Sequence, residues 1–118
     1  MIYMTINKSL LTGSTSTLIL KLLEEKDMYG YEMIETLSNK SDHTFDLKAG
    51  TLYPILHSLE KDELLECYEQ KAENERTRKY YHLTSKGQRF LKEKHKEWIV
   101  YSNAVNKVLN GGLSYAAN

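Results

Sequence analysis

The stretch from Lys48 to Lys61 constrains the fold more than any other part of the chain. Three leucines in it recur at intervals of four and three residues, namely Leu52, Leu56 and Leu59. This spacing places them on one side of an α-helix. Pro54 has no N–H group and belongs in the first turn of a helix, so we expect this helix to begin near Gly50 or Thr51. Its other sides carry small or lightly polar groups, a pattern typical of a helix that presses against another molecule.

Length and charge narrow the possible functions. A chain of 118 residues fits one domain with a core of its own. The formal net charge is zero, so any affinity for nucleic acid has to come from a local cluster. One such cluster lies between residues 76 and 89, which contain no acid. Its five basic residues are Arg76, Arg78, Lys79, Lys86 and Arg89.

Residues with catalytic or metal-binding chemistry are sparse. The single cysteine, Cys67, excludes an internal disulfide and a cysteine-based zinc site. The four histidines fall in different predicted elements, and they are His43, His57, His82 and His95. We find no nucleophile–base pair, no phosphate-binding glycine loop, no signal peptide and no apolar run long enough for a membrane. The sequence therefore predicts a cytoplasmic protein that is not an enzyme and uses no metal or cofactor.

Two helices are predicted before the central stretch. The first spans residues 7–25 and is apolar on nearly two faces, although Ser14 or Ser16 could instead cap a shorter version. Residues 26–28 form a turn, and a second helix follows over residues 29–38. We expect its inward side chains to be Tyr31, Ile34 and Leu37. Together with the third helix they match a helix-turn-helix, in which the third helix reads the DNA major groove.

A β-hairpin is predicted directly after the third helix. Its strands cover residues 64–70 and 78–83, and a charged loop over 71–77 joins them. In the second strand Tyr81 and Leu83 share one face, whereas Tyr80 and His82 share the other, as in a half-buried strand. A hairpin with basic residues at this place is typical of a wing.

The last predicted helix is long and has its own apolar seam. Thr84 or Ser85 caps it, and Ser85 with Gln88 forms a capping-box pattern. The helix runs to about Leu109. The seam recurs at intervals of four and three through Leu91, His95, Trp98, Ser102, Val105 and Leu109. Such a heptad pattern predicts that the helix packs against a partner.

Five short motifs resemble the PadR family of bacterial transcriptional regulators. They are Met28-Tyr29-Gly30-Tyr31-Glu32, Gly50-Thr51-Leu52-Tyr53-Pro54, Leu59-Glu60-Lys61, Arg78-Lys79-Tyr80-Tyr81 and Leu83-Thr84-Ser85-Lys86-Gly87. The resemblance covers about residues 11–87. The single helix after the wing is similar to the short subfamily, which includes a multidrug-responsive repressor with a tryptophan at the place of Trp98. One departure is Glu63, because the family usually has a glycine there, which would suit a left-handed backbone. Glu63 therefore implies a slightly strained or differently shaped turn and leaves the angle of the wing open.

The resemblance implies a mainly α fold with a two-stranded wing, a winged helix-turn-helix that ends in a long dimerisation helix. Residues 1–84 would bind DNA, 85–110 would form the dimerisation helix and 111–118 a tail. Two copies would place their third helices in successive major grooves of a pseudo-palindromic operator in double-stranded DNA. The last helix of one subunit would pack on the first helix of the other. The expected dimer contacts are Leu11, Leu18, Leu91, Trp98, Val105 and Leu109.

The expected DNA-binding residues fall in two groups. The first, from the third helix, is Lys48, Ala49, Gly50, Thr51, Tyr53, Pro54 and His57. The second, from the wing, is Arg76, Arg78 and Lys79, with Lys71 a weaker candidate. Alternatively, Tyr53 packs on the wing, Pro54 only sets the helix start, and the wing charges pair with nearby glutamates. Those glutamates are Glu69, Glu73 and Glu75.

Trp98 is the only tryptophan, and it lies on the seam between His95 and Ser102. If the seam meets its copy across a two-fold axis, a planar aromatic effector could stack between two indoles. Alternatively, Trp98 simply packs the dimer core. We therefore predict a sequence-specific DNA-binding transcriptional regulator of the repressor type, which such a ligand would release from DNA. A protein–protein adaptor without specific DNA binding, and a ligand carrier that no longer uses DNA, remain open at this point.

Overall fold

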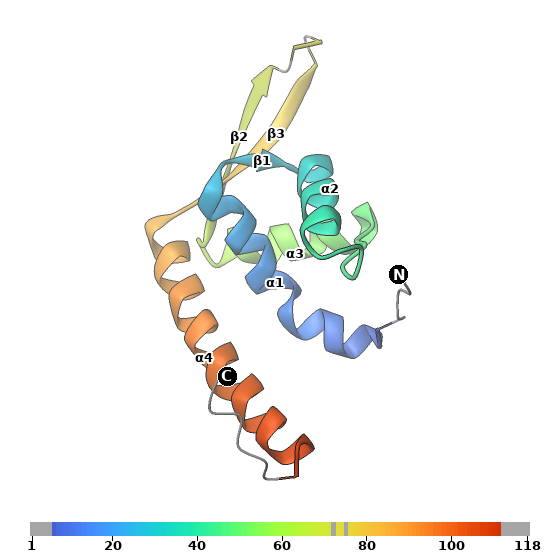
Figure 1. Cartoon of the computed structure of the whole chain (residues 1–118). Helices are drawn as coiled ribbons and strands as arrows, with labels where there is room; N and C mark the ends of the chain where they lie inside the picture. Colours follow the sequence, from blue (N-terminus) through green and yellow to red (C-terminus); the bar gives the residue numbers. More distant parts are fainter. Residues whose placement is uncertain (1–5, 72, 75, 112–118) are drawn as a thin grey trace.

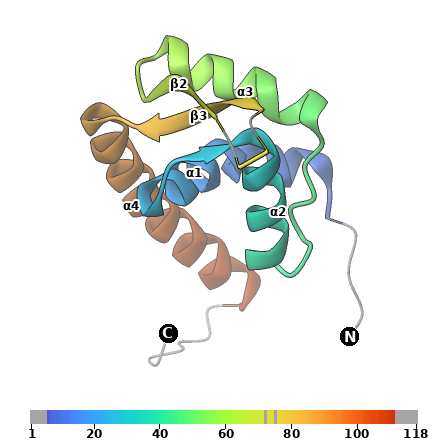
Figure 2. The ribbon, with the colours of Figure 1, turned by 90° about the horizontal axis from the view of Figure 1, so that it is seen from above.

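The computed structural model describes residues 6–71, 73–74 and 76–111. Figure 1 shows its elements, which are α1 (Lys8–Glu25), β1 (Met28–Tyr29), α2 (Gly30–Lys40), α3 (Ala49–Lys61), β2 (Leu65–Lys71), β3 (Thr77–Leu83) and α4 (Ser85–Leu109). The predicted fold class, a mainly α winged helix-turn-helix with a long last helix, is confirmed. Seen from above, α1 lies between α3 and α4 (Figure 2).

The first helix has a clear starting signal, whereas one inward residue of the second was predicted wrongly. The side chain of Asn7 caps α1 by accepting a hydrogen bond of 2.9 Å from the backbone N–H of Ser9, so the longer predicted helix is right. In α2, Tyr31 is 57% exposed and does not point inward. Met33, which is fully buried, packs there together with Leu37 because the two are four residues apart.

The sheet has three strands, because a short strand that was not predicted joins the two-stranded wing. Its antiparallel order is β1-β3-β2, with Met28 opposite Tyr81 and Tyr29 opposite Tyr80. Residues 26–28 were predicted as a turn, yet Met28 starts β1. A strand of two residues is too short to show any periodicity, which is why the sequence pattern gave no sign of it.

The hairpin of β2 and β3 forms the wing, and each strand reaches one residue nearer the tip than predicted. The predicted alternation is confirmed in β3, where Tyr81 and Leu83 are buried and His82 is exposed. The wing and the far end of α4 project from opposite ends of the molecule (Figure 1). The wing pairs with β1 through Tyr80 and Tyr81, on the half of β3 that is farther from the tip.

One hydrophobic core holds these elements together. It includes the three leucines of α3, as predicted, and side chains from every other element. Its members are Ile19, Leu20, Leu22, Leu23, Met28, Met33, Leu37, Leu52, Leu56, Leu59, Leu64, Leu65, Tyr81, Leu83 and Leu91. Thr15 is also buried, and its hydroxyl donates to the carbonyl of Leu11 at 2.7 Å, so this polar group is satisfied.

The turn from α3 into β2 contains a non-glycine residue in the left-handed conformation, which is the strained turn expected at Glu63. Glu63 has φ 63°. Its N–H donates to the carbonyl of Glu60 at 2.9 Å, and the N–H of Leu64 donates to the carbonyl of Leu59 at 2.9 Å. These two bonds are those of a Schellman motif, which normally has glycine at this position. The glutamate therefore holds a conformation that costs an L-residue free energy.

Thr84, not Ser85, caps α4. Its hydroxyl oxygen accepts from the N–H of Gly87 at 2.9 Å, and the same hydroxyl donates to the carbonyl of Glu63 at 2.8 Å. Ser85 is the first helical residue, so the predicted capping box with Gln88 is wrong. Thr84 wins because its side chain also ties the helix start to the turn after α3.

The helix α4 belongs to the core at its start and leaves it further on. Gly87 and Leu91 are buried, whereas most residues after Leu91 are exposed. The predicted division at residues 84 and 85 thus marks the start of the helix but not the end of core packing. The predicted tail lies outside the described residues except for Gly111. No helix among the described residues is long and apolar enough to cross a membrane.

Candidate nucleic-acid interface

The outer face of α3, here called the reader face, is exposed over its whole length. It consists of Lys48, Ala49, Gly50, Thr51, Tyr53, Pro54 and His57. The three core leucines lie on the opposite face, so the helix is fixed from behind. These are the seven residues of α3 that the sequence nominated for DNA contact.

The start of α3 leaves backbone donors open. Lys48 occupies the N-cap position, and no side chain caps the helix there. The N–H groups of Ala49 and Gly50 lie in the first turn, where no intrahelical acceptor exists. Free donors at a helix N-terminus are suited to a phosphate oxygen, and the helix dipole adds to the attraction.

Gly50 is not required by the packing of this chain. A Cβ atom added there would meet nothing within 4 Å. Glycine within a helix destabilises it by roughly 0.5–1 kcal/mol relative to alanine. Gly50 thus costs the free protein stability and faces solvent at an uncapped helix start. Both properties fit a position that another molecule approaches closely.

Pro54 lies deeper in α3 than predicted. It is the sixth residue of the helix, not a residue of the first turn. The carbonyl four residues earlier is that of Gly50, which therefore has no intrahelical donor from Pro54. Because Gly50 is exposed and close to the helix start, this carbonyl can meet water, which explains why the helix tolerates the proline.

Tyr53 has a neighbour that the sequence did not suggest. Its ring lies against Gly30 at the start of α2, where Tyr53 Cζ is 2.8 Å from the place of a Gly30 Cβ atom. The side chain remains 38% exposed. The structure thus replaces the predicted alternative, packing on the wing, with packing on α2, and it leaves part of the phenol facing outward.

The basic residues of the wing differ in their surroundings. Arg76 and Lys79 are exposed, whereas Arg78 is half-buried with its guanidinium 4.3 Å from the centre of the Tyr29 ring. Arg78 and Lys79 are neighbours on one strand, so they lie on opposite faces of the wing. Among the described residues no ion pair joins these three, or Lys71, to an acid; the predicted partner Glu75 is outside that part of the chain.

A carboxylate joins the base of the wing to the segment before α2. Asp27 accepts a hydrogen bond of 2.6 Å from the Tyr68 hydroxyl, and its other oxygen is 2.8 Å from His82 Nδ1. Burial alone raises the pKa of Asp27, but the bonds from Tyr68 and His82 outweigh it and lower the pKa overall. The bond to Asp27 raises the pKa of Tyr68 to about 12. Because the partners are 41 and 55 residues away in sequence, no local motif indicates this cluster.

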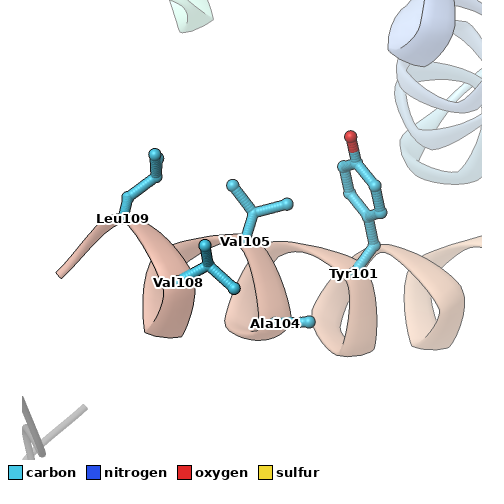
Figure 3. Close-up of a pocket in the computed structure, with 5 residues that line it drawn as sticks. All are labelled: Tyr101, Ala104, Val105, Val108 and Leu109. Atoms are coloured by element: carbon cyan, nitrogen blue, oxygen red, sulfur yellow. The ribbon is translucent and has the colours of Figure 1, made fainter. Parts of the chain in front are cut away.

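The outer half of α4 exposes large apolar side chains. Trp98 is 52% exposed, Tyr101 61%, Val108 80% and Leu109 76%. Figure 3 shows the shallow apolar hollow on this helix, which is lined by Tyr101, Ala104, Val105, Val108 and Leu109. The sequence reasoning missed Tyr101 and Val108, although with Val105 they recur at intervals of four and three. We call Trp98, Tyr101, Val105, Val108 and Leu109 the apolar face of α4.

The other residues of the predicted seam have mixed positions. Leu91 is already buried in the core of its own chain, and the free part of the seam begins after it. His95 is exposed, and the half-buried Ser102 donates to the carbonyl of Ile99 at 3.3 Å. On α1, Leu11 and Leu18 are half-buried and Leu10 is 69% exposed.

Side chains with metal-binding chemistry are dispersed over the described residues. In the part of the chain that the structure describes, no three histidine, cysteine or acidic side chains are placed to hold a metal ion. Cys67 is half-buried beside Tyr81. Burial, together with the neighbouring Cys67, raises the pKa of Tyr81 to about 12, so this phenol is neutral at ordinary pH.

An uncapped third helix, a basic wing and a core of three helices together define a winged helix-turn-helix protein. The chain belongs to the PadR-like family of transcriptional regulators, whose model matches residues 19–93. Membership in this family implies DNA binding and a role in regulation rather than catalysis.

Individual proteins are similar to this chain over most of its length. An uncharacterised protein of Lysinibacillus sphaericus is 35% identical over 106 residues, which is 90% of this chain and 97% of that protein. The solved structure of a PadR-like transcriptional regulator from Bacillus cereus is 34% identical with a TM-score of 0.78, covering 88% of this chain and 99% of that chain. A transcriptional regulator from Clostridium thermocellum has the same identity and TM-score, with 85% and 97% covered.

Proposed function

We propose that the protein is a dimeric, sequence-specific repressor that a planar aromatic ligand releases from DNA. The reader face of α3 contacts base edges and phosphates, and the wing contacts phosphates beside it. Two copies bind a pseudo-palindromic operator, each filling one of two successive major grooves. The observation that carries this proposal is the uncapped, glycine-bearing start of α3, together with a wing whose basic residues have no acidic partners among the described residues.

The chemistry of α3 and the wing indicates that different groups contact phosphates and base edges. Backbone donors, Lys48 and the wing cations are suited to phosphate, which positions a protein on DNA without reading its sequence. Thr51, Tyr53 and His57 offer hydroxyl and imidazole groups to base edges. The reader face has no arginine for bidentate guanine contacts, so discrimination depends on several weaker contacts.

The apolar face of α4 supports a dimer. Side chains such as Tyr101 and Val108 are mostly exposed in the single chain, and covering apolar surface contributes roughly 25 cal/mol per Å². A second copy, with α4 against its partner's α1 as in the family pattern, would bury this face. Leu10 and Leu11 of α1 are available for the same contact.

Trp98 supports the ligand part of the proposal. Its indole is about half exposed and lies 6.1 Å from the Tyr101 ring, centre to centre. Two such pairs across a two-fold axis would form aromatic walls for a flat molecule. No carboxylate stands beside Trp98 on the seam, so a preference for cationic ligands is not expected.

The competing function is a winged-helix adaptor that binds a protein through its wing. The formal net charge of zero favours the adaptor. The acid-free run from Arg76 to Arg89 and the family membership favour DNA.

The test is binding of the full chain to the DNA upstream of its own gene and to a random duplex of equal length, each at two salt concentrations. We expect tight binding to the first DNA only, weakening as salt rises because phosphate contacts release counterions. The Thr51→Ala variant should lose affinity, whereas Lys21→Ala, an exposed change on α1, should not. Equal binding to both duplexes would reject the repressor in favour of the adaptor.

The ligand is tested by titrating flat aromatic compounds while following Trp98 fluorescence, with Trp98→Phe as the control. A compound that quenches the fluorescence should also weaken operator binding. Absence of quenching across a broad panel would remove the ligand from the proposal and leave DNA binding intact.

A further inference from the structure

Four consecutive residues that lead from α1 into α2 together touch both of the elements that face DNA. They are Asp27, Met28, Tyr29 and Gly30, which we call the bridging segment. The segment begins one residue before β1 and ends at the first residue of α2. Met28, Tyr29 and Gly30 are part of a motif that resembles the family, whereas Asp27 lies outside it. None of the four residues is among the DNA or dimer contacts proposed above.

On the wing side, the bridging segment holds both strands of the hairpin. Asp27 bonds to Tyr68 of β2 and to His82 of β3, so a single carboxylate spans the hairpin at its base. Tyr29 packs edge-on against Tyr80 of β3, with ring centres 5.5 Å apart.

Stacking continues outward from this contact. Tyr80 stacks on Tyr68 at 5.8 Å with nearly parallel planes. Arg78, nearer the tip, places its guanidinium over the Tyr29 ring. A wing held by hydrogen bonds and three aromatic rings cannot swing freely about its base.

On the reader side, the same segment touches α3 through Gly30. The aromatic ring of Tyr53 occupies the space in which any other residue at position 30 would have its Cβ atom. Gly30 is therefore required by packing, in contrast to Gly50 of the reader face. The contact fixes the outward angle of Tyr53 and sets the distance between α2 and α3.

We infer that the bridging segment sets the position of the wing relative to the reader face, with Asp27 acting as a positioning residue for the wing and Gly30 for α3. The inference rests on the proposed DNA binding and deepens it. Its consequence is that two residues without DNA contacts control two separable properties of binding. Asp27 controls how many phosphates the wing reaches, and Gly30 controls how well sequence is discriminated.

The wing half is tested with Asp27→Ala, which removes both hydrogen bonds. We expect the slope of log affinity against log salt to fall by about 1 for each phosphate that the wing no longer reaches, equally on operator and random DNA. The ratio between the two affinities should change by less than about threefold. Glu24→Ala, which removes another surface carboxylate, is the matched control and should leave the slope unchanged.

A spectroscopic measurement checks that Asp27→Ala has lost the hydrogen bond between position 27 and Tyr68. The carboxylate raises the pKa of Tyr68, so alkaline titration of tyrosine absorbance should show one phenol fewer with a pKa of about 12 in Asp27→Ala than in the wild type. Tyr68→Phe should likewise show one late phenol fewer. This readout does not depend on DNA binding.

The reader half is tested with Gly30→Ala, which forces Tyr53 to move. We expect the operator affinity to fall at least about tenfold while affinity for random DNA and the salt slope stay nearly constant. The matched control is Gly13→Ala in α1, where an added Cβ atom meets nothing within 4 Å. In a Tyr53→Leu background, Gly30→Ala should have no further effect, because the clash is with the tyrosine ring.

Three outcomes separate the possibilities. Wild-type protein that binds operator and random DNA equally would reject the proposed function and this inference with it. Normal discrimination by the wild type together with wild-type binding by both variants would reject the inference alone. Variants that lose operator and random binding in parallel, with a lower midpoint of thermal unfolding, would show general destabilisation and would also overturn it.

Discussion

The helix α3 and the outer half of α4 both present one open face, but the two faces differ in chemistry and in support. Three buried leucines fix α3 from behind, and its open face carries small, polar and basic groups. The outer half of α4 has left the core, and its open face carries Trp98, Tyr101 and Val108. The difference indicates that one face is made for a charged, hydrated partner and the other for an apolar one.

A rise in salt concentration should weaken DNA binding by α3 but not dimerisation through α4. Contacts of α3 and the wing with phosphate weaken as salt rises. Burial of the apolar face of α4 is a hydrophobic contact, which salt does not screen. A dimer that persists at a salt concentration where DNA is released would therefore support the comparison.

The largest effect is expected from a charge on the apolar face of α4. Val105→Asp places a carboxylate where a partner would bury it, which should cost about 3 kcal/mol or more of dimer stability. Sedimentation velocity should then show a monomer, and operator affinity should fall more than about a hundredfold. Asn103→Asp adds the same charge on the other side of the helix and should leave the dimer intact. A monomeric wild type would contradict the prediction at once.

A second change should move stability and binding in opposite directions. Gly50→Ala meets no atom of the chain, so it should stabilise the fold by roughly 0.5–1 kcal/mol in chemical denaturation. The same methyl group should lower operator affinity by roughly tenfold if DNA approaches the helix start. Gly13→Ala should give the stabilisation without the weaker binding. Unchanged DNA affinity in Gly50→Ala would mean that the reader face is not at the DNA surface.

The wing should respond more weakly and without regard to sequence. Arg76→Ala and Lys79→Ala should each lower the salt slope by about 1 and weaken operator and random DNA alike. Fluorescence anisotropy at four salt concentrations measures this. A change in the ratio of the two affinities would assign a base contact to the wing and so weaken the contrast with α3.

The smallest effect is expected in the turn that follows α3. Glu63→Gly relieves the left-handed conformation and should raise the free energy of unfolding by about 1 kcal/mol. The denaturant midpoint should rise at constant slope, with operator affinity unchanged. The neighbouring Asp62 has φ −82°, so Asp62→Gly should bring no gain. A lower operator affinity in Glu63→Gly would show that this turn also sets the angle of the wing.

The helices and the wing could be predicted from sequence because each repeats a local pattern. The leucines of α3 recur at helical spacing, and Tyr81 and Leu83 alternate as in a strand. The prediction was wrong where two local patterns compete. Tyr31 and Met33 fit an inward face equally well by spacing, and only the packing of α2 on the core decides between them.

The parts of the site that escaped prediction depend on contacts between distant residues. Nothing near Asp27 in the sequence points to Tyr68 or His82, and nothing near Gly30 points to Tyr53. By contrast, the opposite faces of Arg78 and Lys79 follow from strand geometry alone. A pattern thus tells which residues share a face, but it does not tell which two elements meet.

The unbroken course of α4 has a mechanical consequence. A helix of 25 residues is about 37 Å long, and its first turns are locked into the same core that supports α3. Tilting such a rod by about 5° moves its far end by roughly 3 Å, close to the rise of one base pair. In a dimer joined through the far ends of its two α4 helices, a ligand bound beside Trp98 would need to change the angle between these helices only slightly. Both α3 helices would then no longer fit their major grooves.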